Sequence, residues 1–182
     1  MKRIVVIVLA TIGLTSFRNP THIKANHSLL LQDMFGGTWK YQNGNDVFIV
    51  TLWRDLDGDG YRGHYKKITV DACGNQVAEI YNSNKPIGHS TTNWPYVINS
   101  GNISQYYSIG GPIDDNTVTN TPNAGGFIEG SFVMKILNPN CYTPPTNACS
   151  LQAQWTVKKD YGLGNPAEPD FNIPTNVVLT KQ

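Results

Sequence analysis

Residues 37–54 contain a β-hairpin signal that directs this chain toward a sheet architecture. Two runs of β-prone residues, GTWKYQ and NDVFIVTLWR, flank the dipeptide Asn43-Gly44. Asn-Gly is the preferred sequence for a two-residue type I′ loop, because both central positions of that turn need a positive φ. With this loop, Trp39 is predicted to pair with Phe48 across the hairpin.

Alternation within the hairpin separates two faces. Because successive side chains of a strand point to opposite sides, one face carries the larger apolar set, which consists of Trp39, Tyr41, Phe48, Val50 and Leu52. The other face also holds Val47, Ile49 and Trp53, so we expect the strand over 46–54 to be central in its sheet. A slip by one residue would turn the larger set toward solvent.

Further strands are predicted along the chain by alternation and turn residues. They cover residues 61–70, 76–82, 127–137, 150–158 and 176–180. The alternation in 61–70 slips by one at Lys66-Lys67, which predicts a β-bulge. The stretch 83–125 is rich in Asn, Ser, Thr, Gly and Pro and is predicted to be mostly loop. The pattern is typical of a sandwich or an up-and-down barrel.

The first 25 residues have the features of a secretory signal peptide. Lys2-Arg3 form a basic start, and residues 4–14 form an apolar run shorter than a transmembrane helix needs. Residues 26–182 are then predicted to form a single β domain. No cysteine stands directly after the apolar run to accept a lipid. We therefore expect an exported protein, periplasmic or extracellular, without a lipid anchor. An uncleaved N-terminal anchor is the alternative.

Charge argues against a nucleic-acid partner. Removal of residues 1–25 leaves 10 of the 14 basic residues against 13 acidic ones, so the net charge falls from +1 to about −3. The remaining Lys and Arg form no run longer than two residues. A surface that tracks phosphates needs a basic cluster, so we expect no nucleic acid to bind.

The chain contains three cysteines, Cys73, Cys141 and Cys149. In an exported protein, Cys141 and Cys149 are predicted to form a disulfide that closes the loop between them. Cys73 lies in the turn-like sequence DACGN and would remain a free thiol. No histidine neighbours it, so we interpret it as a turn residue rather than a nucleophile.

Several of these segments together resemble a known family. Residues 37–41 (GTWKY) with the Asn-Gly turn, the strands GYRGHYKKI and SLQAQWTVKK, and the closing PDFNIPTNVVLTKQ follow the order found in that family. It is a bacterial family of small exported proteins, classified only as a domain of unknown function and lipocalin-like in character. The resemblance covers most of residues 35–182. It implies an all-β fold, an antiparallel up-and-down, lipocalin-like barrel or strongly curved sheet of about eight strands, and no reaction.

A turn crowded with carboxylates follows the hairpin. Asp55, Asp57 and Asp59 alternate before Gly60, as in the first half of a calcium-binding loop. The twelfth position of such a loop needs a bidentate Glu, and it is Lys66 here, so an EF-hand is excluded. A weaker Ca²⁺ site is one interpretation. A solvated loop without any cofactor is the interpretation we prefer.

The inward aromatic residues Trp39, Tyr41, Phe48 and Trp155 allow two interpretations. They could line a cavity for a small apolar or amphipathic ligand, as in a closed barrel. They could instead fill the core of a structural or protein-interaction module. Trp53, Tyr106 and Tyr107 are predicted to be exposed and could stack on sugars.

No pattern in the chain predicts catalysis. There is no Gly-x-Ser-x-Gly elbow, phosphate-binding loop or dinucleotide fingerprint. His64 has no second metal ligand near it in sequence, and a Glu79–Glu129 pair rests on no spacing argument. We therefore expect a monomeric, non-catalytic protein that binds a small ligand or associates with the cell envelope.

Overall fold

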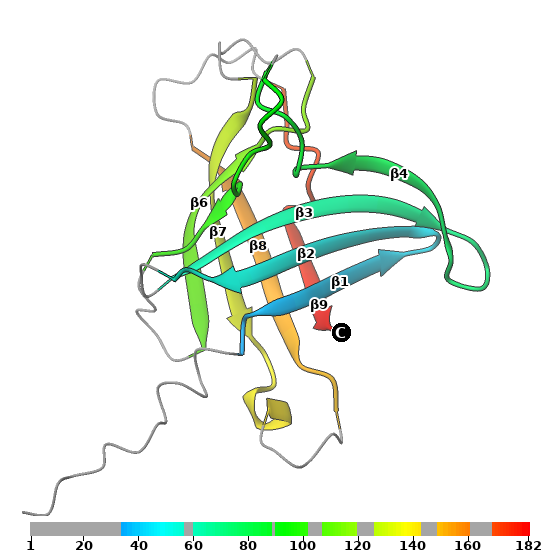
Figure 1. The fold of residues 1–182 in the computed structure, drawn as a ribbon. Coiled ribbons are helices and arrows are strands. Elements are labelled where there is room, and N and C mark those ends of the chain that lie inside the picture. Colours follow the sequence, from blue (N-terminus) through cyan, green and yellow to red (C-terminus); the bar gives the residue numbers. More distant parts are fainter. Residues whose placement is uncertain are drawn as a thin grey trace, which may run out of the picture.

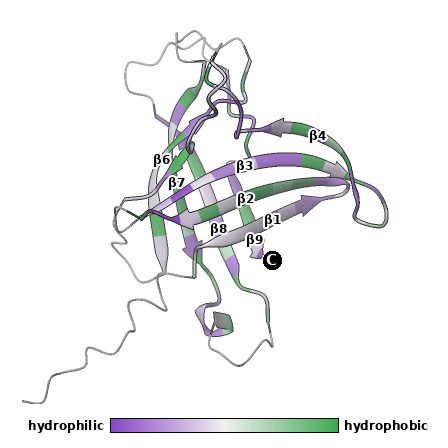
Figure 2. Ribbon diagram, in the orientation of Figure 1, coloured by the Kyte–Doolittle hydropathy of each residue, from purple (hydrophilic) through white to green (hydrophobic). Residues whose placement is uncertain are grey.

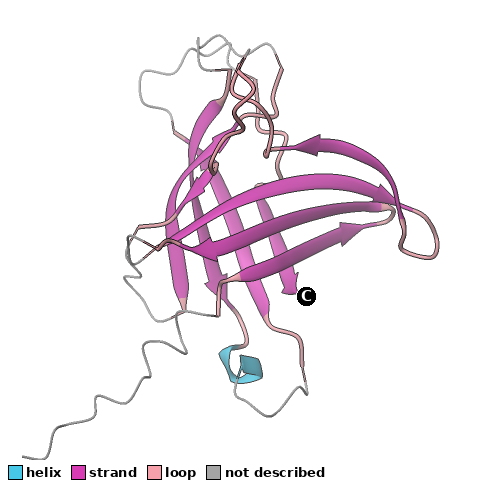
Figure 3. Cartoon of the chain, viewed as in Figure 1, coloured by secondary structure: helices cyan, strands magenta, loops and turns pink. Residues whose placement is uncertain are grey.

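Eight antiparallel strands close into a barrel, and a ninth strand extends from it. The computed structural model describes residues 34–56, 60–88, 90–101, 107–119, 126–142, 149–160 and 169–182. The strands are β1 (Gly37–Asn43), β2 (Asp46–Arg54), β3 (Tyr61–Val70), β4 (Gln76–Asn82), β5 (Ile98–Asn99), β6 (Ser108–Asp115), β7 (Ile128–Ile136), β8 (Gln152–Lys159) and β9 (Asn176–Lys181). A 3-10 turn, η1 (Pro139–Tyr142), follows β7. These residues contain no α-helix (Figure 3).

The strand order explains the closure. Neighbours run β2-β1-β9-β8-β7-β6-β5-β3, and β3 pairs back onto β2. β4 pairs with β3 alone and stands outside the ring. Figure 1 shows β1, β2 and β3 crossing β7, β8 and β9 at a large angle. The predicted all-β barrel is therefore confirmed, and the sandwich alternative is wrong.

The register of the β1–β2 hairpin differs from the predicted one by two residues. Trp39 pairs with Val50 instead of Phe48, and the turn residues are Gly44-Asn45 instead of Asn43-Gly44. Gly44 takes the positive φ, 60°, at the first turn position, where a glycine is as suitable as at the second. A shift by two residues leaves every side chain on its predicted face.

The predicted bulge at Lys66-Lys67 is not an insertion in β3. The pairing of β3 with β2 is continuous. The pairing of β3 with β4 is irregular at two places, and in both the unpaired extra residue, Ile80 or Val77, belongs to β4. The apolar alternation slips for another reason. Beyond Tyr65 the outer face of the hairpin carries its own apolar cluster, formed by Val47, Ile49, Ile68 and Val70.

The middle of the chain contains two strands that were predicted as loop. β5 is wedged between β3 and β6, and Ile98 pairs with Ile113. A Cβ at Gly60 would overlap the carbonyl of Ser100, and one at Gly111 would overlap the carbonyl of Asn99. Gly111, one of the glycines that made this stretch look like loop, therefore lets β5 approach β6, and Gly60 does the same at the start of β3.

The barrel interior holds one apolar core. Inward residues of β7 and β8 are buried at alternate positions, as predicted, and hydrophobic and hydrophilic residues alternate along these strands (Figure 2). The largest fully buried side chains include Trp39, Trp155, Tyr61, Tyr65, Phe35 and Phe132. Met34 and Phe35 join this core, so the chain immediately before β1 packs on the sheet. Residues 26–33 lie outside the described residues.

The buried carboxyl group of Asp115 forms hydrogen bonds with β3, with the segment after β6 and with the segment before β9. Asp115, which is fully buried, accepts hydrogen bonds from the Tyr65 hydroxyl (2.7 Å), from the backbone and hydroxyl of Thr117, and from the backbone N–H of Asn172 (2.7 Å). Burial and the nearby Asp115 raise the pKa of Tyr65 well above its usual value, so its hydroxyl keeps the proton that it donates.

We expect Tyr65→Phe to lower the free energy of unfolding by about 1.5–3 kcal/mol, the usual range for a hydrogen bond to a charged group. The loss leaves Asp115 with one donor fewer in a place that water does not reach. Urea unfolding followed by circular dichroism measures the change. Tyr107→Phe, at an exposed tyrosine, is the control and should stay within about 0.5 kcal/mol of the parent. Equal stability of the two variants would contradict the assigned role.

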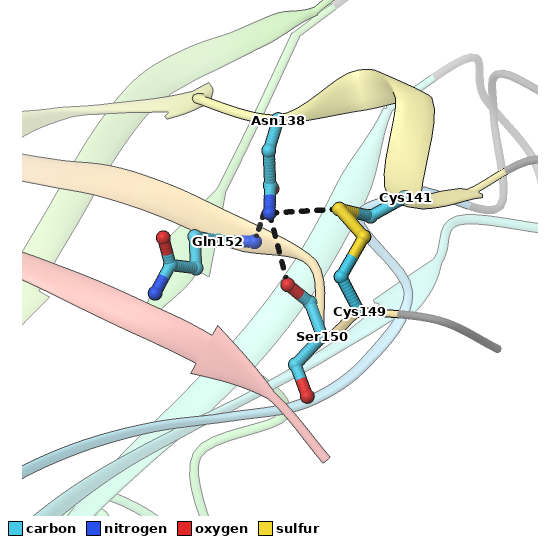
Figure 4. Close-up of a disulfide and its surroundings, with 5 residues drawn as sticks. All are labelled: Asn138, Cys141, Cys149, Ser150 and Gln152. Carbon is cyan, nitrogen blue, oxygen red and sulfur yellow. Dashed lines mark hydrogen bonds between the residues drawn. A yellow bond between two sulfur atoms is a disulfide. The ribbon is translucent and has the colours of Figure 1, made fainter.

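The predicted disulfide between Cys141 and Cys149 is present, with the two Cα atoms 5.4 Å apart. Asn138 holds both ends of this connection. Its side-chain nitrogen donates to Cys141 Sγ and to the carbonyl of Ser150, and its oxygen accepts from the backbone N–H of Gln152 at 2.6 Å (Figure 4). The disulfide and Asn138 therefore fix the exit from β7 against the entry to β8.

Replacing both Cys141 and Cys149 with alanine should lower the free energy of unfolding by about 2 kcal/mol, because the bridge restricts the unfolded chain. Cys73→Ala is the matched control, since Cys73 is exposed and free, and we expect it to have the parental stability. Chemical unfolding without reductant gives both values. A double variant as stable as the control would show that the bridge contributes nothing.

Candidate functional site

The four aromatic residues predicted to bind a ligand lie in the barrel interior. Trp39 and Trp155 are fully buried, Phe48 is 2 % exposed, and Tyr41 is partly buried against the same core. The ring centroids of Phe48 and Trp155 are 6.3 Å apart, and Phe132 stacks on Trp155 with a centroid separation of 5.3 Å. These rings contact one another, which is the arrangement of a packed core.

The polar atoms of the two interior tryptophans are also used within the protein. The Trp39 indole N–H donates to the carbonyl of Phe35 at 2.8 Å, and the Trp155 indole N–H donates to the carbonyl of Pro174 at 3.0 Å. A ligand in the interior would have to find its hydrogen bonds elsewhere. The sequence pattern placed these residues on the correct face but said nothing about their partners.

The carboxylates predicted to bind Ca²⁺ are only partly described. Asp57 and Asp59 lie outside the described residues. Asp55 forms an ion pair with Arg62, with a separation of 2.8 Å. Arg62 in turn lies over the Tyr96 ring, 4.3 Å from its centroid. Within the described ranges no three His, Cys, Asp or Glu side chains converge on a point.

The described residues also form a groove on the outer face of the barrel. Its volume is about 310 Å³, at the lower end of the range for small-molecule sites. The lining residues come from β2, β3, the end of β4 and the segment after it, and they are Ile49, Thr51, Trp53, His64, Tyr65, Lys66, Asn82 and Asn84. No carboxylate is among them. We call this the outer groove.

Strand register explains why these side chains meet. Thr51 pairs with His64, and Ile49 pairs with Lys66, so both pairs point to the same, outward side of the β2–β3 hairpin. Asn82 pairs with Lys66 from the other edge of β3. The lining therefore comes mainly from three hydrogen-bonded strands, which position side chains more rigidly than a loop would.

His64 supports the Trp53 ring from the side. The two ring centroids are 5.5 Å apart, and His64 Nδ1 forms a hydrogen bond of 3.1 Å with the Ser83 hydroxyl. Burial lowers the pKa of His64, and hydrogen bonds with the backbone of Pro95 and Trp94 partly oppose this effect. The ring is therefore held in place and favoured in its neutral form near pH 7.

The contact between Ser83 and His64 has the residue types of a nucleophile–base pair, but Ser83 is fully buried. Its hydroxyl oxygen also accepts the backbone N–H of Tyr65 at 2.9 Å. A substrate carbonyl cannot approach an oxygen in that position, so this contact is structural. What the outer groove offers to a ligand is an aromatic ring, amides, a hydroxyl and one ammonium group.

Sequence reasoning placed Trp53 on the surface and treated His64 as isolated. The structure joins them, because β2 and β3 pair without a break from Arg54–Tyr61 to Asp46–Thr69. A signal for this was present. The predicted strands 46–54 and 61–70 are joined by a short turn, so pairing them would already have put Trp53 near His64. Asn82 and Asn84 carried no such signal.

We expect acid to destabilise this protein through His64. The unfolded chain takes up a proton near the usual pKa of 6.5, whereas the folded chain takes it up only at lower pH. The stabilisation is therefore complete above pH 6.5 and is lost as the pH falls toward the lowered pKa. Urea unfolding at pH 7.5 and pH 5 should show a larger loss for the parent than for His64→Gln. Identical losses would mean that His64 is not responsible.

Comparison with known proteins identifies a family and nothing further. The model of DUF6705, described as a family of unknown function, matches residues 1–182. No curated protein and no solved structure matches the chain. The resemblance to a domain of unknown function is confirmed by this match. Within the described residues, no helix has the length and hydropathy needed to cross a membrane.

Proposed function

The chain belongs to the family DUF6705, whose function is unknown, and we propose that it is a non-catalytic binding module that holds a small ligand in its outer groove. The observation that carries this proposal is the position of Trp53, 39 % exposed, at the wall of a groove with polar side chains from three paired strands. Ligand sites combine apolar surface with a few well-placed polar groups in this way.

The interior ligand expected from the sequence is a less favourable proposal. Phe48 and Phe132 both pack against Trp155, and the indole N–H groups of Trp39 and Trp155 have carbonyl partners. A ligand placed among them would have to displace packed aromatic rings. Truncating a buried Phe or Trp lowers the free energy of unfolding by about 3–5 kcal/mol, so this displacement would be costly. Binding to the outer groove displaces none of them.

We propose further that the protein acts outside the cytoplasm, in the periplasm or the extracellular space. The Cys141–Cys149 disulfide supports this location, because such bridges persist in oxidising compartments and are rare in the cytosol. The predicted signal peptide over residues 1–25 points the same way. Mass spectrometry of the protein from its native source would give both the processed N-terminus and the oxidation state.

The four tryptophans make the binding proposal testable by NMR, since each gives one indole N–H signal. A library of small polar and apolar fragments is added to the protein. We expect hits to move the Trp53 signal and to leave the signals of Trp39 and Trp155 in place. Hits that move Trp39 and Trp155 would instead support an interior site. A library without hits would favour the filled, structural module.

Trp53→Ala should weaken the binding of such hits by roughly tenfold or more, because tryptophans at the wall of a site are frequent hot spots. Tyr107→Ala is the matched control. Tyr107 is 43 % exposed, close to the value for Trp53, but does not line the outer groove. Equal losses for both variants would show that the effect is not specific to the groove.

A further inference from the structure

The unused hydrogen-bonding groups of the outer groove are mainly donors. In the part of the chain that the structure describes, neither the Trp53 indole N–H nor the Lys66 ammonium group has a partner, and the side-chain nitrogen of Asn84 donates to none. The groove has no carboxylate in its lining. A ligand that complements it must therefore be rich in acceptor oxygens.

Asn82 and Asn84 are already held in place before any ligand arrives. The Asn82 side chain donates to Glu79 Oε2 at 3.2 Å and accepts the backbone N–H of Asn84 at 3.0 Å. The Asn84 oxygen accepts from the Asn93 side chain at 3.1 Å, which leaves its nitrogen as the free group. Preorganised amides lose little conformational entropy on binding, which favours recognition of a hydroxyl-rich ligand.

Trp53 provides a flat surface at one end of the groove. An indole face carries negative potential, and the C–H bonds on one face of a pyranose ring carry partial positive charge. A sugar ring thus stacks on an exposed tryptophan while its hydroxyls remain free to bind the amides. His64 lies beside the ring with an angle of 41° between the two planes and limits its movement.

Lys66 carries the one ammonium group in the lining and lies toward the other end. It pairs with Ile49, four residues before Trp53 on β2. At the usual strand rise these two positions are about 13 Å apart. Positions this far apart along the strand are spanned by linked sugar units rather than by a single sugar, so a ring on Trp53 and an anionic group at Lys66 belong to different units of one chain.

We propose that the outer groove binds an acidic oligosaccharide, with one sugar ring stacked on Trp53 and the carboxylate of another unit of the same chain at Lys66. This inference rests on the proposed function and adds the class of ligand to it. Lys67, the next residue, does not line the groove. It faces the opposite side of β3, pairs with Asp46 at 2.7 Å, and so provides a matched control for the charge.

The test compares β-1,4-linked trimers of glucuronic acid and of glucose, which differ at C6 alone. Calorimetry on the full, oxidised chain should give about fivefold tighter binding of the acidic trimer, the upper range for a surface charge pair. Lys66→Met should remove this preference, Lys67→Met should keep it, and Trp53→Ala should weaken both trimers by roughly tenfold. Glucuronic acid alone should bind more weakly than its trimer.

Three results would overturn the inference: equal binding of the two trimers, an acidic preference that survives Lys66→Met, or no binding of either trimer. The fragment screen separates this failure from that of the proposed function. If fragments move the Trp53 signal while neither trimer binds, the groove is a ligand site for another class of compound. If neither fragments nor trimers bind, both proposals are wrong. Urea unfolding midpoints confirm that each variant is folded.

Discussion

Two strands, β4 and β5, pair with the same edge of β3, and both the closure of the barrel and the outer groove depend on this arrangement. β4 pairs with its second half, from Lys66 to Val70, and β5 pairs with Arg62 and Gly63. Between them the chain leaves the sheet at Ser83. The Ser83 N–H donates to the carbonyl of Tyr65, and the Ser83 hydroxyl accepts the N–H of Tyr65, both at 2.9 Å. An unpaired buried N–H would cost about 1–3 kcal/mol, and the serine side chain avoids that cost.

The shared edge of β3 separates the packed interior of the barrel from its outer groove. On the inner side of β3, the aromatic residues of the barrel pack into one core. Asp115 accepts hydrogen bonds from Tyr65 of β3 and from Asn172, and so holds the segment before β9 against the barrel. Outward of β3, the departing chain leaves Asn82 and Asn84 beside the face that carries Trp53 and Lys66. Stability therefore comes from the interior, and the surface is where side chains with unused hydrogen-bonding capacity remain.

Local patterns were reliable where the physical cause was local. The inward faces of β1, β2, β7 and β8 followed from alternation, because burying one face is a property of each strand alone. The turn was off by one residue and the register by two, since Asn43-Gly44 and Gly44-Asn45 are both acceptable turn sequences. β6 was missed because its glycines and Pro112 are unfavourable in strands. The lack of a side chain at Gly111 lets β5 approach closely, which no local pattern reveals.

The sequence by itself determined the all-β class, the inward residues of β1, β2, β7 and β8, the Cys141–Cys149 pairing and the family. Each of these follows from side-chain chemistry or short spacing, which a linear pattern records. Only the tertiary structure decided that the predicted ligand-binding aromatics pack together, that Ile68 and Val70 face outward, and that His64 meets Trp53 and Ser83. These depend on barrel closure and on the shared edge of β3, where residues distant in sequence come into contact.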